Sequence, residues 1–194
     1  MRCTSLLSVV LLASAMLGSS PSRAATQSVT YTFKSGNSPT GDPDPLVWVQ
    51  GVPVQNLNFP SSELPLQFAF VVDSIPNWGL IDGARWVSPT PDGVGPPGGY
   101  KYFVPFPVPP GLKSARLDIV WRADDVGGLH LNDMDVHEQS PAMYPPNKPA
   151  AEFHGDVTRF LMPGMNQLEF IVVNSRTGIN PTGISFYATF VLTY

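Results

Sequence analysis

GLKSARLDIVWRADD, residues 111–125, is a proline-free segment in which apolar and polar side chains alternate. Leu117, Ile119 and Trp121 fall on one face of an extended chain, which is the pattern of a strand with one buried side. The segment LEFIV at residues 168–172 repeats the same alternation. We therefore expect two long strands here, with Trp121 in the core between sheets.

Proline is the strongest structural signal in the rest of the chain, which holds 22 prolines in 194 residues. Because a proline costs about 3 kcal/mol inside a helix, only the few proline-free windows, chiefly residues 111–140 and 164–180, could hold a helix. The windows between prolines are instead rich in β-branched and aromatic residues, which favour strands. Further strands are predicted at residues 29–33, 46–49, 66–72, 100–108, 128–131 and 184–194.

Two features modify this strand pattern. Pro105 and Pro107 fall inside one predicted strand, which places that strand at a sheet edge or at a bulge. One short helical turn is predicted at residues 157–162, with Asp156 as its N-cap and a Pro-Gly pair that stops it. Many short strands with turn-forming residues between them indicate an all-β fold, an antiparallel β-sandwich with one short helical turn.

The first 24 residues have the pattern of a secretory signal. Arg2 precedes an apolar run that is too short to span a membrane, and Ser22 and Ala24 supply the small residues that signal peptidase reads. We expect a signal peptide at residues 1–24 and a single β-sandwich domain at residues 25–194. This predicts a secreted or periplasmic protein with no membrane insertion.

Charge and cysteine content exclude some kinds of site and partner for the mature chain. The single cysteine, Cys3, lies in the signal, so the mature chain has neither a disulfide nor a thiolate metal site. Removing Arg2 and Arg23 lowers the basic residues from 11 to nine against 15 acidic ones, a net charge of −6. Such a surface repels phosphate backbones, so no nucleic-acid partner is expected.

Three ordered groups of motifs carry a resemblance to a known family. They are PNW and GARWVSP within residues 76–89, the segment from Tyr100 through Ala123-Asp124-Asp125 to Asn132, and residues 155–174. Together they resemble the galactose-binding-like jelly-roll domains of exported bacterial proteins and of glycoside hydrolase accessory modules. The resemblance implies a jelly roll that is released rather than anchored. Family members usually have Asn-Gly where this chain has Asn132-Asp133, two residues that tolerate a positive φ.

Carboxylates gather around one predicted turn. Asp124 and Asp125 are followed closely by Asn132 and Asp133, and hard oxygen ligands close together suit calcium. The spacing matches no EF-hand loop. Asp124, Asp125 and Asp133 are therefore candidate calcium ligands, with turn capping and solvated charge as the alternative reading. No other cofactor is expected.

Sugar binding needs flat aromatic faces and polar groups that bond hydroxyls. Trp78 and Trp86 flank a glycine-containing loop, Tyr144 lies in a proline-rich loop, and Asn132 lies in a predicted turn. These four residues are the candidate ligand-binding set. The alternative for the two tryptophans is that they pack in the core beneath a long loop.

No catalytic motif occurs in the chain: there is no nucleophile elbow, zinc-protease motif or phosphate loop. His130 and His137 could meet across a tight connection, but zinc would need a third ligand, so we interpret the histidines as unrelated. We therefore expect a secreted protein that is not an enzyme: a binding module for carbohydrate or a cell-surface glycan. The alternative is a structural or adhesive extracellular protein that contacts other proteins.

Overall fold

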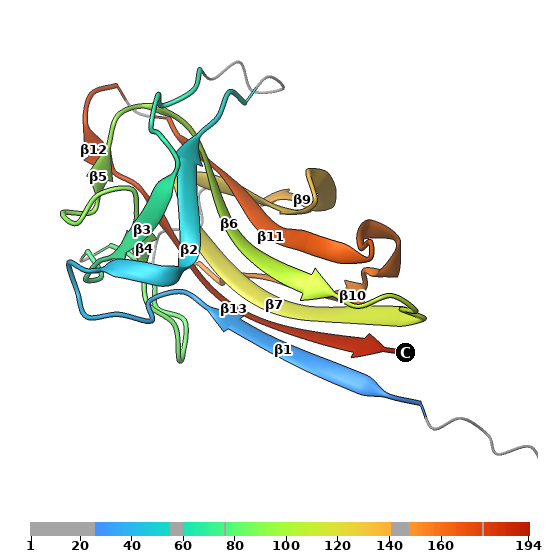
Figure 1. The fold of residues 1–194 in the computed structure, drawn as a ribbon. Coiled ribbons are helices and arrows are strands. Elements are labelled where there is room, and N and C mark those ends of the chain that lie inside the picture. The colour runs from blue at the N-terminus through green and yellow to red at the C-terminus, as the bar shows by residue number, and fades with distance from the viewer. Residues whose placement is uncertain (1–25, 55–59, 76, 141–147, 176) are drawn as a thin grey trace, which may run out of the picture.

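The computed structural model describes residues 26–54, 60–75, 77–140, 148–175 and 177–194, and Figure 1 shows its fold. The predicted signal peptide lies outside these residues. In chain order the elements are β1 (Ser28–Lys34), β2 (Pro43–Gly51), β3 (Gln67–Val71), β4 (Val87–Ser88), β5 (Val94–Gly95), β6 (Gly98–Val108), β7 (Ser114–Asp124), β8 (Val126–Leu131), β9 (Met134–Ser140), β10 (Ala151–Asp156), the 3₁₀ turn η2 (Thr158–Phe160), β11 (Gly164–Asn174), β12 (Asn180–Pro181) and β13 (Gly183–Thr193). Among the described residues no helix is long and apolar enough to cross a membrane.

Apart from β5 and β12, which pair as a small sheet of their own, the strands form two antiparallel layers that are joined at one corner. One layer has the order β10-β7-β13, with β1 paired to the free side of β13. The other has the order β3-β2-β6-β11-β8-β9, and the short strand β4 pairs with both β13 and β3 to connect them. Figure 1 shows the long strands β7, β13 and β1 side by side. The predicted antiparallel β-sandwich is confirmed.

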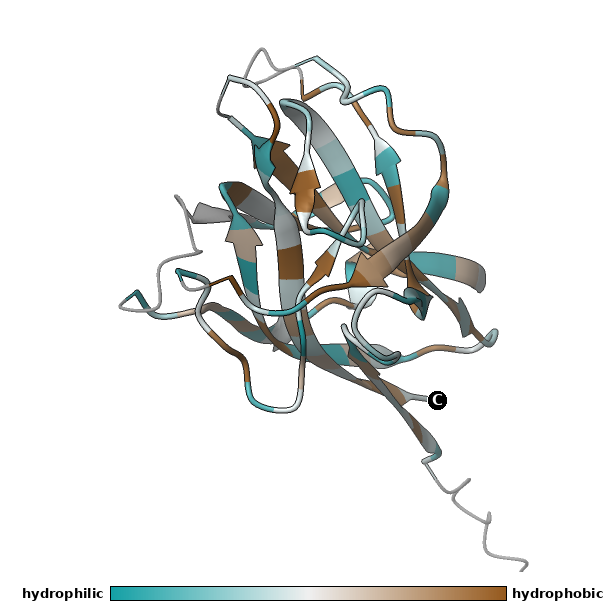
Figure 2. Ribbon diagram, turned by 90° about the vertical axis from the view of Figure 1, so that its left-hand side faces the viewer, coloured by the Kyte–Doolittle hydropathy of each residue, from teal (hydrophilic) through white to brown (hydrophobic). Residues whose placement is uncertain are grey.

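The core lies between the two layers and is largely aromatic. Phe106 of β6 packs on Phe190 of β13 with ring centroids 4.8 Å apart, and Phe170 of β11 lies 4.8 Å from Phe186 of β13. Trp121 is fully buried, as the alternation in β7 predicts. The same alternation of apolar and polar residues is visible along the strands in Figure 2.

The prolines of β6 lie where the sheet is locally open. The strand as a whole is not at an edge, because β6 lies between β2 and β11. However, its pairing with β2 ends at Phe103, so Pro105 and Pro107 pair with β11 alone. The prediction of an edge strand is therefore wrong for β6 as a whole and correct for its second half. There the prolines, which lack a backbone N–H, have no β2 partner with which a hydrogen bond could be lost.

The predicted helical turn is shorter than expected. It spans three residues, and Val157 rather than Asp156 occupies the N-cap position. Asp156 Oδ1 still accepts a hydrogen bond from the Thr158 backbone N–H at 3.0 Å. Leu161 is already in extended backbone, and Pro163 disfavours helical geometry in Met162, so the turn does not continue beyond Phe160.

Candidate functional site

A pocket of about 130 Å³ lies at one end of the sandwich, where the chain leaves β3, β7 and β11. Its lining residues are Ile75, Asn77, Trp78, Asp124, Asp125, Asn180 and Pro181. The pocket therefore brings together three residues that the sequence singles out, the two adjacent aspartates and one tryptophan.

Both aspartates of this pocket are held by the protein itself. Trp78 Nε1 donates to Asp124 Oδ2 at 2.8 Å, and the Ser175 backbone N–H and hydroxyl donate to Asp125 Oδ2 at 2.8 and 2.7 Å. The two aspartates are 6% and 7% exposed. Their hydrogen bonds fix the carboxylates in the pocket wall, which gives the pocket an acceptor-rich lining.

The two tryptophans near this pocket belong to the interior. Trp78 and Trp86 are 4% and 1% exposed, and their rings stack with centroids 4.1 Å apart. Trp86 Nε1 donates to the Gly79 carbonyl at 2.9 Å. The structure thus matches the core-packing reading of these residues and leaves no open ring face for a sugar. Tyr144 lies outside the described residues.

Asn132 and Asp133 lie at the other end of β8, in the tight turn to β9. Their φ angles are 52° and 63°, as a two-residue hairpin of this type requires. Asn132 Nδ2 donates to the Phe160 carbonyl at 2.8 Å, and its Oδ1 accepts from the Gln167 N–H at 2.9 Å. The amide is therefore used within the chain, to fasten the turn to η2 and β11.

The three predicted calcium ligands do not come together. The six residues of β8 separate Asp133 from the aspartate pair, a distance of about 20 Å along a strand. Asp133 instead bonds to Lys101. Within the described parts of the chain, no three His, Cys, Asp or Glu side chains are grouped so as to hold a metal ion.

A second surface crosses the six-stranded layer, and we call it the sheet-face row. Six residues on β3, β2, β6, β11, β8 and β9 pair in continuous register. They are, in this order, Phe68, Trp48, Phe103, Glu169, His130 and Asp135. Their neighbours along β2, β6, β8 and β11 are fully or almost fully buried, which places the row on the outer face of the layer.

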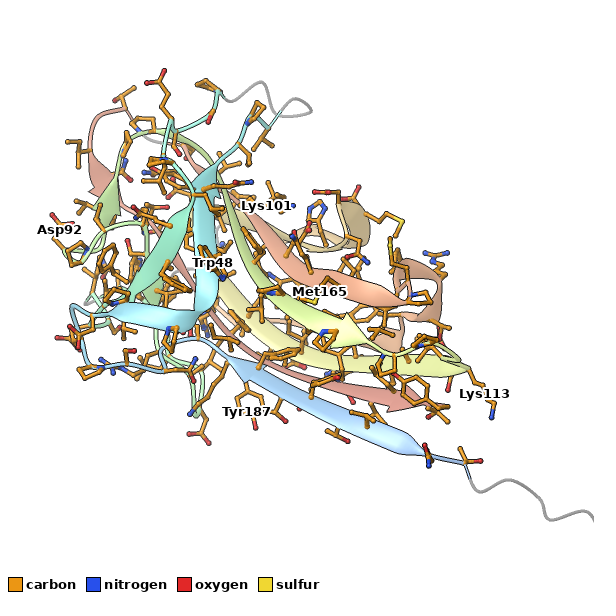
Figure 3. All side chains as sticks on the ribbon, in the orientation of Figure 1. Trp48, Asp92, Lys101, Lys113, Met165 and Tyr187 are labelled. Atoms are coloured by element: carbon orange, nitrogen blue, oxygen red, sulfur yellow. The ribbon has the colours of Figure 1, made fainter. Side chains whose placement is uncertain are left out.

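The first half of the row is aromatic. Trp48 lies against Phe68 with ring centroids 4.0 Å apart and against Phe103 at 6.4 Å. Phe68 is 36% exposed, and the other two rings are partly buried. Figure 3 labels Trp48 on β2 and Lys101 on the neighbouring strand β6. These three strands thus present aromatic carbon to solvent on a face where alternation normally places polar groups.

The second half of the row is charged and centres on Glu169, which is 1% exposed. Lys101 Nζ lies 2.9 Å from Glu169 Oε1 and 2.7 Å from Asp133 Oδ1, and the Asp133 N–H donates to Glu169 Oε2 at 3.0 Å. Burial raises the pKa of Glu169. Burial opposes the charge of Lys101, but hydrogen bonds to Asp133 and Glu169 outweigh it and raise the lysine pKa. The pair is therefore a buried ion pair that fixes the hairpin turn.

The outer end of the row is open to solvent. His130 Nδ1 lies 3.1 Å from Asp135 Oδ1, and the side chain of Asp135 is 75% exposed. Burial lowers the pKa of His130, so its imidazole is neutral at pH 7. A neutral imidazole and an exposed carboxylate offer hydrogen-bond donors and acceptors beside the aromatic half. Sequence reasoning did not bring these six residues together, although Trp48 stood out as one of four tryptophans and His130 was weighed as a zinc ligand.

Comparisons with known proteins leave the function open. No protein-family model matches the sequence, and no curated protein is similar enough to match it. Among solved structures, an FMN-binding beta-glucuronidase from Facaelibacterium prausnitzii L2-6 is 13% identical, with a TM-score of 0.41 over 84% of this chain and 23% of that one. A beta-glucuronidase from an uncultured Clostridium sp. is 13% identical, with a TM-score of 0.42 over 89% and 30%.

A third solved structure is the isomalto-dextranase of Arthrobacter globiformis T6 complexed with panose, which is 11% identical. Its TM-score is 0.37, over 86% of this chain and 32% of that one. The chain thus spans between about a quarter and a third of the length of these structures. All three are carbohydrate-active enzymes by their names, and a likeness this distant assigns neither ligand nor activity here.

Proposed function

We propose that this chain is a secreted, non-catalytic module that binds carbohydrate, built on a galactose-binding-like jelly roll. The observation that carries the proposal is the sheet-face row, in which an aromatic half adjoins a polar half in register. A sugar ring has an apolar C–H face and a rim of hydroxyls, so it needs both kinds of surface side by side.

The sheet-face row suits a glycan better than the end pocket does. The pocket, at about 130 Å³, is well below the roughly 300–1,000 Å³ that is usual for ligand sites. Its carboxylates also accept hydrogen bonds from Trp78 and Ser175. The row, in contrast, has aromatic carbon exposed at Phe68 and polar groups exposed at Asp135.

The chemistry of the row favours binding over catalysis. Glu169 has the raised pKa that a general acid needs, but it is 1% exposed and its carboxylate is engaged by Lys101 and the Asp133 N–H. A general acid must lie within hydrogen-bond reach of the substrate. A buried, ion-paired carboxylate instead holds the surface in shape.

Calcium enters the proposal only at the end pocket. Asp124 and Asp125 lie there with Asn77 and Asn180, so two carboxylate and two amide residues line one small space. These are the hard oxygen donors that calcium prefers. Asp133 has no part in such a site, because it lies at the far end of β8.

A glycan array followed by calorimetry tests the carbohydrate proposal. Trp48→Ala should weaken saccharide binding at least tenfold, about 1.4 kcal/mol. Tyr187→Ala is the matched control, because Tyr187 is an aromatic residue that is 37% exposed on β13, in the other layer. Equal affinity in both variants, or no saccharide binding by the wild type, contradicts the proposal. Self-association that Trp48→Ala abolishes, without saccharide binding, would favour the structural or adhesive alternative.

A further inference from the structure

We infer that the sheet-face row binds an internal stretch of an extended glycan chain that carries no acidic groups, with the chain lying across the strands. This rests on the proposed function and names its ligand class. Three features of the row point to this ligand: its length, its open ends and the sign of its charges.

The row is longer than a single sugar. It crosses six strands, and neighbouring strands lie about 4.8 Å apart, so Phe68 and Asp135 are separated by about 24 Å. A pyranose ring with its glycosidic oxygen is about as long as the spacing between two neighbouring strands. The row therefore matches four to five consecutive units, of which the aromatic half would contact two or three.

Both ends of the row are exposed. Phe68 is 36% exposed at one end, and the side chain of Asp135 is 75% exposed at the other. A site that recognises the end of a chain encloses its ligand, as ligand pockets generally do. A row that is open at both ends lets the chain continue past it in both directions, so an internal segment fits as well as a terminus.

The charges of the row select against acidic sugars. Its polar half contains the carboxylates of Glu169 and Asp135, and the carboxylate of Asp133 and the ammonium group of Lys101 lie beside it. Lys101 Nζ already contacts two of the carboxylates, so it has little charge left to offer a ligand. His130 lies between Glu169 and Asp135 in the row, so it too is flanked by carboxylates. A uronate or sulfate would thus meet net negative charge, while a neutral hydroxyl would find acceptors.

The test uses soluble glycans of one backbone that differ in length or in charge. Calorimetry with neutral β-1,4-linked gluco-, manno- and xylo-oligosaccharides of two to six units measures the length dependence. Affinity gels with hydroxyethylcellulose, glucomannan and arabinoxylan, and with anionic carboxymethylcellulose and polygalacturonate, measure the charge dependence. At least one neutral series should gain tenfold or more in affinity from two to five units and then level off. The neutral polymer with the same backbone as that series should retard the protein in the gel, and the two anionic polymers should not.

Variants at the two ends of the row sharpen the test. Phe68→Ala and Asp135→Ala should each weaken binding of a hexasaccharide at least threefold, while at most one of them affects a disaccharide. Tyr187→Ala should change neither. Asp135→Asn should allow some binding of carboxymethylcellulose at low ionic strength.

The outcomes separate this inference from the proposed function. If single sugars bind and affinity does not rise along the series, the extended ligand is overturned and carbohydrate binding stands. The same conclusion follows if single sugars bind and none of the neutral polymers retards the protein. Equal binding of the neutral and anionic cellulose derivatives overturns the charge selection. If no saccharide of any length binds, the proposed function itself fails.

Discussion

Replacing Lys101 by methionine removes the ion-pair partner of Glu169, the buried residue in the charged half of the sheet-face row. The substitution keeps most of the aliphatic stem and removes the ammonium group, which lies 2.9 Å from Glu169 Oε1. Glu169 is 1% exposed and the lysine side chain 10%, so this is a buried pair. Removing one partner of such a pair costs about 3–5 kcal/mol. The contact with Asp133 adds at most about 1 kcal/mol, because that carboxylate is 81% exposed.

The cost should depend on pH through Glu169. Its pKa is raised above the ordinary value of 4.5 in the folded protein, so the folded state binds this proton more tightly than the unfolded chain. The resulting stabilisation is fully present below pH 4.5 and is lost as pH rises through the folded pKa. Without Lys101 that pKa rises further. The variant should therefore lose least stability near pH 4.5 and most at pH 7.

Urea denaturation at pH 4.5 and pH 7 measures both effects. Lys113→Met is the matched control, because Lys113 is exposed (Figure 3), and it should change stability by less than about 0.5 kcal/mol. The double variant Lys101→Met, Glu169→Met should recover most of the loss, since it removes the unpaired carboxylate as well. A loss below about 1 kcal/mol at pH 7, or an equal loss in the single and double variants, would refute the buried-pair reasoning.

Three further predictions concern other parts of the molecule. Trp121→Ala should cost about 3–5 kcal/mol in a denaturation experiment, and a loss below about 1 kcal/mol would contradict its burial. A hydrogen bond to Asp118 raises the pKa of His154, so NMR should show that histidine titrating above 6.5, and Asp118→Asn should lower the value; an unchanged value would exclude the bond. Millimolar calcium should raise the melting temperature relative to chelator, and Asp124→Asn with Asp125→Asn should abolish the shift; identical wild-type midpoints would exclude the ion.

The strands that were predicted correctly are those whose own sequence shows apolar residues in a strand-like pattern. Over residues 114–121 of β7 every second residue is apolar and fully buried, and the residues between them are less buried. β9 and β10 were missed because they are polar, with sequences MDVHEQS and AEFHGD. β10 pairs with β7 at the end of its layer and is only half-buried, so it needs few large apolar side chains. Such strands form because a neighbour supplies backbone partners, which a single segment cannot reveal.

The sheet-face row depends on register, and register is a property of the assembled sheet. Trp48 and Glu169 lie far apart in sequence, and only the pairings of β2 with β6 and of β6 with β11 place them in one line. A local sign did exist: Trp48 and Phe103 sit on the outer face of strands whose inner face is already apolar. An aromatic residue at such a position indicates an exposed apolar surface and hence a binding face.

Asn132 shows how a residue predicted to bind ligand acts from a distance. Its side chain bonds the Phe160 carbonyl and the Gln167 N–H, and its positive φ forms the turn between β8 and β9. Together these contacts fix the register in which His130 pairs with Asp135 and with Glu169. A slip of one residue in β8 would turn His130 toward the core and replace it on the outer face by an apolar neighbour. Asn132 therefore contributes to the proposed site by holding the polar half of the row in line with the aromatic half.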